Sequence, residues 1–171
     1  MKGPIVLVGP MGSGKTSVGR ALARRLGWPH VDVDWALEKR HRQSVAAQFA
    51  SVGEAEFRRR ESAELARCLG SAQVVSTGGG VVLLPENRRR LKARLTIYLQ
   101  ASPDALARRL DGTQARKRPI LKGKSVIRVL RRLQRERSGL YQSVAAFVVR
   151  ASQGDAQAVA QRVWARCKEL C

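Results

Sequence analysis

Cysteine, aromatic and acidic residues are all scarce in this chain of 171 residues. The three cysteines, Cys68, Cys167 and Cys171, show no C-x-x-C spacing, so the sequence indicates neither a zinc site nor a disulfide framework. Aromatic residues make up 5% of the sequence, and no RNP-like or zinc-finger motif accompanies them. Because proteins that read bases commonly stack them on aromatic side chains, we expect no specific nucleic-acid partner.

Long hydrophobic runs are also absent. No run approaches the roughly eighteen apolar residues that a membrane span needs, and the first residues lack the pattern of a signal peptide. We therefore expect a cytoplasmic protein without a membrane partner. With 44% hydrophobic residues the chain can bury a core of its own, and we expect one domain over residues 1–171 that acts as a monomer.

Acidic residues are so few that the charge is strongly one-sided, because 33 Lys and Arg against 13 Asp and Glu give a formal net charge of +20. Such a field attracts polyanions, so binding of nucleic acid has to be weighed against binding of small anionic substrates. Residues 108–137 alone hold twelve Lys and Arg, opposed by Asp111 and Glu136. This cluster is either a solvated basic face or a source of positive charge for a phosphate group.

The most informative stretch runs from Gly9 to Thr16 and has the pattern G-x-x-x-x-G-K-T of a phosphate-binding loop. It follows the apolar run 5–8, which favours a buried strand, and it precedes residues 15–26, whose apolar positions have helical spacing. Glycines let backbone N–H groups turn toward a phosphate, and the start of the helix adds its positive dipole end. A glycine-rich turn that binds nothing is the alternative.

This loop predicts a binding site for ATP and Mg²⁺. In such loops the lysine holds the β- and γ-phosphates and the hydroxyl residue binds Mg²⁺, and these are the roles that we expect of Lys15 and Thr16. The loop residues expected to bind ATP are Gly12, Ser13, Gly14, Lys15, Thr16 and Ser17.

Two carboxylates occur in the next expected strand, residues 30–34. Because ligands of open α/β sheets lie beyond the carboxyl ends of the strands, Asp32 and Asp34 should arrive beside the phosphate loop. If the strand stays extended to its end, its alternation places both side chains on one side. The alternative is a helix that starts here, with Asp34 as its N-cap and Asp32 exposed beside it.

A helix expected over residues 54–69 begins its apolar stripe with a charged pair, Arg58 and Glu61. The pair is either a surface salt bridge or an arrangement in which Glu61 orients Arg58 toward a ligand, and we favour the second. The strand expected at residues 73–76 is followed by three glycines, 78–80. They form either a flexible turn or a place where a ligand comes close to the backbone.

The later sequence continues the alternation of strands and helices. The remaining elements are two strands, residues 95–99 and 147–149, and four helices that begin near Pro85, Pro103, Val126 and Asp155. We expect the arginine-rich helix from Pro85 to be solvated and the last helix to turn Leu170 inward. Residues 111–124 have weak periodicity, so we expect a mobile loop that closes over the nucleotide as a lid.

Taken together, these motifs resemble the shikimate kinases, small phosphate-loop kinases that phosphorylate the 3-hydroxyl of shikimate. The resemblance runs from about residue 5 to residue 149, and its specificity comes from the order and spacing of several motifs. Those motifs are the loop 9–16, Asp32-Val33-Asp34, the run 53–61, Gly78-Gly79-Gly80, Arg118-Pro119, Glu136-Arg137 and Leu140-Tyr141.

The resemblance implies a fold as well as a reaction. The fold would be a three-layer α/β phosphate-loop kinase with a five-stranded parallel sheet in the order 2-3-1-4-5. It would carry a substrate-binding segment at about residues 33–62 and a lid over residues 111–124.

The resemblance also implies roles for individual residues. Shikimate would be held by Asp34, Arg58, Gly79, Gly80 and Arg137, and Asp32 would assist Mg²⁺ through water. Arg109 and Pro119 would flank adenine, and the catalytic residues would be Lys15, Asp34 and Arg118. Asp34 would act as base, and Arg118 would reach the phosphates from the lid. Two arginines suit a carboxylate, since a guanidinium group pairs with it through two hydrogen bonds.

Two rival interpretations remain open. One is a kinase for another small hydroxylated acid, such as gluconate, or for a nucleotide. The other is a basic nucleic-acid-binding or regulatory protein that binds ATP without catalysis, but such a protein would be expected to lose part of the set Lys15, Asp32, Asp34, Arg58 and Arg137, which is complete here. We therefore expect ATP-dependent phosphorylation of shikimate, a step of chorismate and aromatic amino-acid biosynthesis.

Overall fold

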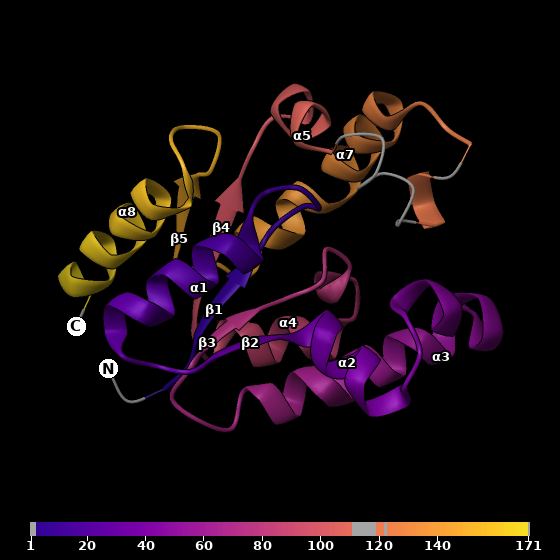
Figure 1. Ribbon diagram of the computed structural model, residues 1–171, viewed down its shortest axis with the longest axis horizontal. Coiled ribbons are helices and arrows are strands. Elements are labelled where there is room, and N and C mark those ends of the chain that lie inside the picture. Colours follow the sequence, from indigo (N-terminus) through magenta and orange to yellow (C-terminus); the bar gives the residue numbers. More distant parts are fainter. Residues whose placement is uncertain (1–2, 111–118, 122, 171) are drawn as a thin grey trace.

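A five-stranded parallel sheet organises the fold (Figure 1). The computed structural model describes residues 3–110, 119–121 and 123–170. The strands are β1 (Ile5–Val8), β2 (His30–Asp32), β3 (Val74–Ser76), β4 (Leu95–Gln100) and β5 (Phe147–Arg150). They pair in the order β2-β3-β1-β4-β5, which confirms the order expected of a phosphate-loop kinase.

Helices cover both faces of this sheet and give the fold three layers. One face carries α1 (Lys15–Leu26) and α8 (Ala156–Glu169), and the other carries α2 (Val33–His41), α3 (Val45–Cys68), α4 (Pro85–Lys92) and α7 (Val126–Val144). The chain also forms α5 (Pro103–Arg109) and two 3₁₀ helices, η1 (Val81–Leu83) and η2 (Pro119–Leu121). Strand alternation explains the layers, because Ile5 and Leu7 belong to one hydrophobic cluster while Val6 and Val8 belong to the other.

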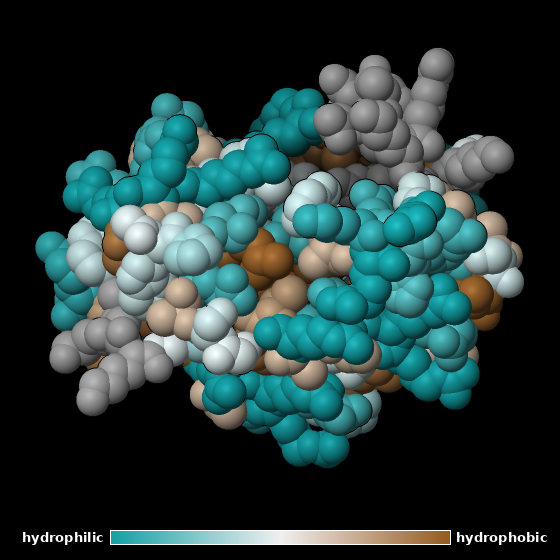
Figure 2. Space-filling view, turned by 60° about the horizontal axis from the view of Figure 1, so that its bottom comes forward, coloured by the Kyte–Doolittle hydropathy of each residue, from teal (hydrophilic) through white to brown (hydrophobic). Residues whose placement is uncertain are grey.

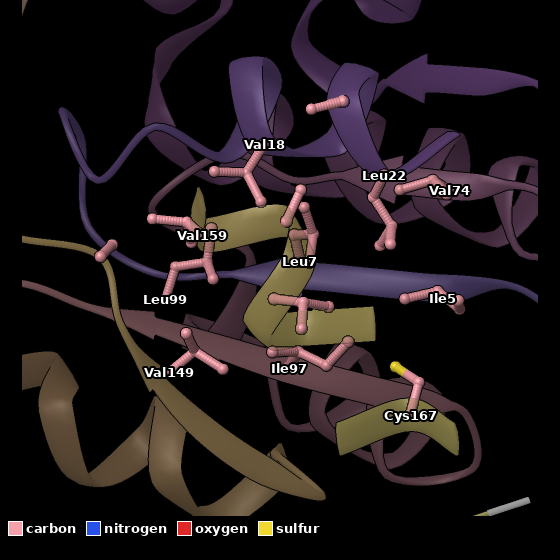
Figure 3. Packing of buried hydrophobic residues seen from close by; sticks show 14 of the residues in the cluster. Ile5, Leu7, Val18, Leu22, Val74, Ile97, Leu99, Val149, Val159 and Cys167 are labelled. Carbon is pink, nitrogen blue, oxygen red and sulfur yellow. The ribbon is translucent and has the colours of Figure 1, made fainter. Parts of the chain in front are cut away.

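The core on the α1–α8 face packs both helices against the sheet (Figure 3). Val18 and Leu22 of α1 and Val159 and Val163 of α8 are at most 2% exposed and belong to one cluster with the strand residues. Burying each such side chain stabilises the fold by about 1.5–3 kcal/mol relative to leaving it exposed. The start of α1 is therefore anchored through its apolar side to the sheet and to α8.

A capping serine and a glycine determine where α3 begins and where it is interrupted. The Ser44 side chain accepts a hydrogen bond from the backbone N–H of Ala47 at 3.1 Å and caps α3. Gly53, with φ 74° and ψ 171°, interrupts the helical backbone, so α3 consists of two helical pieces, and the second corresponds to the helix expected over residues 54–69. The second piece carries Arg58 and Glu61 toward the carboxyl ends of the strands.

Two expectations about local structure are wrong. The strand expected over residues 30–34 ends at Asp32, because its carboxylate accepts hydrogen bonds from the backbone N–H groups of Asp34 (3.1 Å) and Trp35 (3.4 Å) and thereby starts α2. The N-cap is thus Asp32, and Asp34 lies in the first turn of the helix. Leu170 does not turn inward either: it follows the last residue of α8 and is 58% exposed.

Figure 2 shows a face covered mostly by hydrophilic side chains, with small hydrophobic patches between them. In the parts of the chain that the structure describes, none of the helices is long and apolar enough to cross a membrane.

Candidate active site

The phosphate loop connects the carboxyl end of β1 to α1 and lies against β4 and α5. At Gly9, which has φ +148°, a Cβ atom would lie 2.6 Å from the carbonyl oxygen of Leu99 in β4. Only glycine fits such close approach of two backbones in this conformation. At Gly12, with φ +77°, a Cβ atom would lie 3.1 Å from the side chain of Leu110, which follows α5. The loop is therefore seated by backbone contacts that the glycines permit.

Lys15 folds its ammonium group back over this loop. Its Nζ donates hydrogen bonds to the carbonyl oxygens of Gly9 (2.9 Å) and Pro10 (2.8 Å) and lies 3.5 Å from Oγ of Ser13. Lys15 is 8% exposed and Ser13 is 1% exposed. The positive charge thus lies over the loop itself, where phosphate-binding loops hold the phosphates.

Thr16 and Asp32 bring two oxygen groups together beside the loop. The Thr16 hydroxyl donates a 2.6 Å hydrogen bond to Oδ2 of Asp32, while Oδ1 of Asp32 caps α2. Mg²⁺ in kinase sites commonly takes one or two protein oxygens and completes its shell with waters and substrate phosphates. This pair fits such a site, because both groups are hard oxygen donors adjacent to Lys15.

A second hydrogen-bonded chain holds the first turn of α1. The Ser76 hydroxyl at the end of β3 donates to the carbonyl oxygen of Lys15 at 2.9 Å. Its oxygen is therefore the acceptor for Nε2–H of His30, 3.0 Å away. Gly19 leaves room for the pair, since a Cβ atom there would lie 2.6 Å from Oγ of Ser76. Burial lowers the pKa of His30, Asp32 opposes this shift, and Arg20 adds to it.

The three glycines after β3 gather side chains from separate helices. At Gly78, a Cβ atom would lie 2.7 Å from Oδ1 of Asp34 and 2.8 Å from Oε1 of Glu61. At Gly80, a Cβ atom would lie 2.5 Å from Cζ of Arg58. These two positions lack a side chain where a carboxylate of α2 and a charged pair of α3 reach the turn.

Glu61 and two aromatic rings hold Arg58 in place. Nη1 of Arg58 donates to Oε2 of Glu61 at 2.7 Å, and the guanidinium carbon lies 5.7 Å from the ring centre of Phe49 and 5.4 Å from that of Phe57. The Glu61 side chain is 2% exposed and that of Arg58 is 13% exposed. Burial raises the pKa of Glu61 and the nearby Arg58 opposes that shift. The pair is not a surface salt bridge, which favours the interpretation that Glu61 orients Arg58.

Arg137 and Tyr141 of α7 reach the same turn from the other side. Nη1 of Arg137 donates to the carbonyl oxygen of Gly79 at 3.1 Å, and the Tyr141 hydroxyl donates to the same oxygen. Burial raises the pKa of Tyr141, which keeps the hydroxyl protonated as a donor. Among the described residues, Nε of Arg58 and Nε of Arg137 are buried without a hydrogen-bond partner. Two guanidinium groups with unused donors therefore lie at the glycine turn.

The sequence model of the shikimate kinase family matches residues 11–168, most of the chain. The chain belongs to the shikimate kinase family. Among curated proteins of this family, it is 44% identical over 163 residues to shikimate kinase 2 of Dickeya chrysanthemi, an alignment that covers 94% of each chain. It is 45% identical over 161 residues to shikimate kinase of Paracidovorax citrulli, with 90% of this chain and 87% of that one covered. Like them, it is a kinase.

Solved structures of the family have the same fold. Shikimate kinase from Acinetobacter baumannii in complex with shikimate superposes with a TM-score of 0.92 at 34% identity, over 98% of this chain and 93% of that one. The shikimate kinase from Aquifex aeolicus gives a TM-score of 0.81 at 29% identity, over 96% of each chain. A gluconokinase from Sinorhizobium meliloti, at 22% identity and a TM-score of 0.59 over 98% of this chain and 97% of that one, shares the fold alone.

Of the three further residues expected to bind ATP, Arg109 is fully described, Pro119 is described in part and Arg118 is not described. Arg109 ends α5 and donates a 2.6 Å hydrogen bond from Nη2 to the carbonyl oxygen of Ala151, just after β5. Pro119 begins η2, and only its backbone is described. Arg118 and most of the expected lid, residues 111–124, lie outside the described residues.

A cavity of about 660 Å³ lies at the amino ends of the strands, opposite to the phosphate loop and the glycine turn. Its lining includes Pro4, Ala72, Leu95 and Ala146, which are at or near the amino ends of β1, β3, β4 and β5. Ligands of open α/β sheets bind beyond the carboxyl ends of the strands, where the phosphate loop and the glycine turn are. Chemistry and topology therefore place the active site away from this cavity.

Sequence reasoning missed some side chains that shape the site. Phe49 and Phe57 flank Arg58, but a pair of aromatic residues eight positions apart gives no signal beyond that of core packing. Tyr141 belongs to the motif Leu140-Tyr141, but the sequence assigns no role to its side chain. In the structure its hydroxyl donates to the carbonyl oxygen of Gly79. Arg88 was expected to be solvated, but Nη1 donates to the carbonyl oxygens of Val82 (2.7 Å) and Leu83 (2.9 Å). The contacts of Tyr141 and Arg88 join separate elements, and the contact of Arg58 with Phe49 joins the two helical pieces of α3.

Proposed function

We propose that the site holds its two substrates from opposite sides, with the phosphate loop binding ATP and the glycine turn binding shikimate. The reaction of this family member is the ATP-dependent phosphorylation of shikimate, a step of aromatic amino-acid biosynthesis. The acceptor that we propose is the 3-hydroxyl. The observation that carries the shikimate assignment is the meeting of one carboxylate, Asp34, and two guanidinium groups, Arg58 and Arg137, at residues 78–80.

On the ATP side, the backbone of residues 12–17 and the start of α1 surround the phosphates, and Lys15 neutralises charge on the β- and γ-phosphates. The ammonium group now bound to the carbonyl oxygens of Gly9 and Pro10 exchanges these contacts for phosphate oxygens. Arg118 adds positive charge from the lid, residues 111–124. Arg109 and Pro119 contact adenine, which is supported by the hydrogen bond that ties Arg109 to the segment after β5.

Thr16 and Asp32 would hold Mg²⁺, Thr16 through its hydroxyl and Asp32 through a bound water. The 2.6 Å hydrogen bond between the two side chains supports this assignment, because it brings two hard oxygen donors to one point beside Lys15. The ion would neutralise negative charge on the phosphates as the phosphoryl group is transferred.

On the shikimate side, Arg58 and Arg137 bind the carboxylate, since a guanidinium group pairs with a carboxylate in a planar, bidentate geometry. Their buried, unpartnered Nε atoms support this role. The backbone of Gly79 and Gly80 lines the pocket between them, and the substrate-binding segment, residues 33–62, completes it. Asp34 accepts hydrogen bonds from the hydroxyl groups and takes the proton from the one that attacks the γ-phosphate.

These side chains all come from one chain, so we propose that the enzyme works as a monomer. ATP, its phosphoryl donor, is abundant in the cytoplasm, where we place its activity. No specific nucleic-acid partner is needed for this function.

A coupled assay of ADP release, with and without shikimate, tests the two-sided assignment. Asp34→Asn keeps the size of the side chain but removes its basicity, so turnover should fall by roughly 10² or more, with little change in the KM for ATP. Arg58→Lys keeps the charge but loses the planar fork, so the KM for shikimate should rise while the KM for ATP stays constant. The assignment fails if both variants keep wild-type kinetics, or if a shikimate analogue without the carboxylate binds as well as shikimate.

A further inference from the structure

Asn87 is a fully buried amide, and its hydrogen-bond partners in the described parts of the chain do not include the proposed substrate-binding side chains. It is 0% exposed and lies in the first turn of α4. Its Nδ2 donates to the carbonyl oxygen of Val81 at 3.0 Å, and its Oδ1 accepts from the hydroxyl of Ser62 at 2.7 Å. A buried polar side chain that uses both of its ends in this way joins α4 to two other segments, η1 and α3.

The first of these links holds the glycine turn. η1 begins at Val81, directly after the three glycines, and it continues their backbone, since Val81 N–H donates to the Gly78 carbonyl at 3.3 Å and Leu83 N–H to that of Gly80 at 3.0 Å. Asn87 binds the first carbonyl of η1, and Arg88 binds the next two. The position of the turn is therefore set by side chains of α4.

The second link holds α3. Ser62 is 6% exposed, follows Glu61 directly and lies one helical turn beyond Arg58. Its oxygen accepts a 2.9 Å hydrogen bond from Nη1 of Arg90 while its hydroxyl hydrogen is given to Asn87. The part of α3 that carries the proposed carboxylate-binding arginine is thus fixed to α4 next to Glu61.

We propose that Asn87 is a positioning residue for carboxylate recognition: through Val81 and Ser62 it fixes the glycine turn against the helix that carries Arg58. The proposal rests on the proposed function, in which Arg58 and Arg137 hold the carboxylate of shikimate. Arg137 is tied to the turn at Gly79, while Arg58 belongs to α3, so the spacing of the two guanidinium groups depends on how the turn sits against α3. A misplacement of about 1 Å can cost as much as 10² in rate.

Two substitutions break the two links separately. Asn87→Asp keeps the volume and the acceptor for Ser62, but it places a carboxylate oxygen against the Val81 carbonyl in place of the N–H donor. Ser62→Ala removes the donor to Asn87 and leaves the η1 link intact. Val163→Ala is the matched control, because Val163 is also 0% exposed but lies in the hydrophobic cluster on the opposite face of the sheet.

Steady-state kinetics for both substrates, together with thermal unfolding of each variant, test the proposal. Asn87→Asp should raise the KM for shikimate about tenfold, and Ser62→Ala about threefold, while the KM for ATP stays within about twofold, as expected for lost positioning on one side of the site. Val163→Ala should lower the melting temperature without changing the KM for shikimate.

The proposal is overturned if Asn87→Asp raises both KM values equally, or if the KM for shikimate rises in Val163→Ala by as much as in Asn87→Asp at a similar loss of stability. If Asn87→Asp does not fold, Ser62→Ala decides by the same criteria. Arg58→Lys is measured alongside. An unchanged KM for shikimate in Arg58→Lys contradicts the proposed site itself. If Arg58→Lys raises the KM for shikimate but Asn87→Asp and Ser62→Ala leave it unchanged, only the role of Asn87 is contradicted.

Discussion

The phosphate loop and the glycine turn lie side by side at the carboxyl edge of the sheet, yet their glycines serve different purposes. In the loop, Gly9 adopts φ +148° and its Cα faces a backbone carbonyl of β4, so the conformation of the main chain requires glycine. In the turn, Gly80 has an ordinary φ of −97° and faces the guanidinium group of Arg58. One half of the site is therefore built from backbone, and the other half from side chains that converge on it.

The difference teaches how each half should fail. A substitution of Gly9 in the loop works against rigid neighbours and should disturb ATP binding and stability together. A substitution at the turn displaces the flexible end of a side chain and should disturb shikimate binding with less loss of stability. The following variants test this contrast.

Lys15→Ala should have the largest effect. Removing the ammonium group takes away the charge that we assign to the β- and γ-phosphates, so turnover should fall by about 10³ or more, the scale on which charge-stabilising donors matter. The fold should remain, because the hydrogen bonds that Nζ of Lys15 donates to the carbonyl oxygens of Gly9 and Pro10 join residues of one loop and not distant segments. Stopped assays and circular dichroism measure the two quantities. Normal turnover by a folded variant would show that the phosphate loop is wrongly assigned.

Gly9→Ala should damage stability and ATP binding at once. The new Cβ would lie 2.6 Å from the Leu99 carbonyl oxygen in a backbone conformation that alanine rarely adopts. The free energy of unfolding should fall by about 1–3 kcal/mol, and the KM for ATP should rise, because the loop must move away from β4 to relieve the clash. Urea unfolding and kinetics check this. A variant with unchanged stability would mean that the loop is not held by its backbone contacts.

Gly80→Ala should impair shikimate binding more than it lowers stability. Its Cβ meets the guanidinium end of Arg58, a flexible group, so the melting temperature should fall less than in Gly9→Ala. The displaced guanidinium group should raise the KM for shikimate about tenfold and leave the KM for ATP unchanged, as for loss of one positioned contact. Equal rises of both KM values would remove the distinction between the two halves.

The same contrast explains how much could be predicted from the sequence. The phosphate loop is one continuous segment with a fixed pattern, so its position between β1 and α1 and the parallel sheet around it were predicted correctly. Asp32 was correctly predicted to lie beside the loop, but its role as the N-cap of α2 was not predicted. The short alternation of polar and apolar residues over 30–34 fits both a strand that runs to residue 34 and a helix that starts at residue 33.

The glycine turn could be predicted only in outline. The sequence marked Arg58 and Glu61 as unusual because a charged pair begins an apolar stripe, and the structure shows that pair to be buried. It gave no sign of Asn87 or Ser62, because a single amide and a single hydroxyl have many roles, and their hydrogen bonds join residues 25 positions apart. Positions decided by contacts between distant segments cannot be read from local patterns.

His30→Gln should have the smallest effect, and it concerns the support of the phosphate loop. A glutamine keeps an N–H donor for Ser76, which holds the Lys15 carbonyl, but it does not titrate. Because burial lowers the pKa of His30 below 6.5, the unfolded chain binds a proton as the pH falls below 6.5 while the folded protein does not. Stability from this group is therefore present above pH 6.5 and is lost as the pH falls through the lowered value.

The unfolding free energy of the wild type, measured in urea at a series of pH values, should fall more steeply below pH 6.5 than that of His30→Gln. His41→Gln is the matched control, since the chain has 2 histidines and His41 lies at the end of α2. If His41→Gln flattens the profile and His30→Gln does not, the pH dependence does not arise from His30.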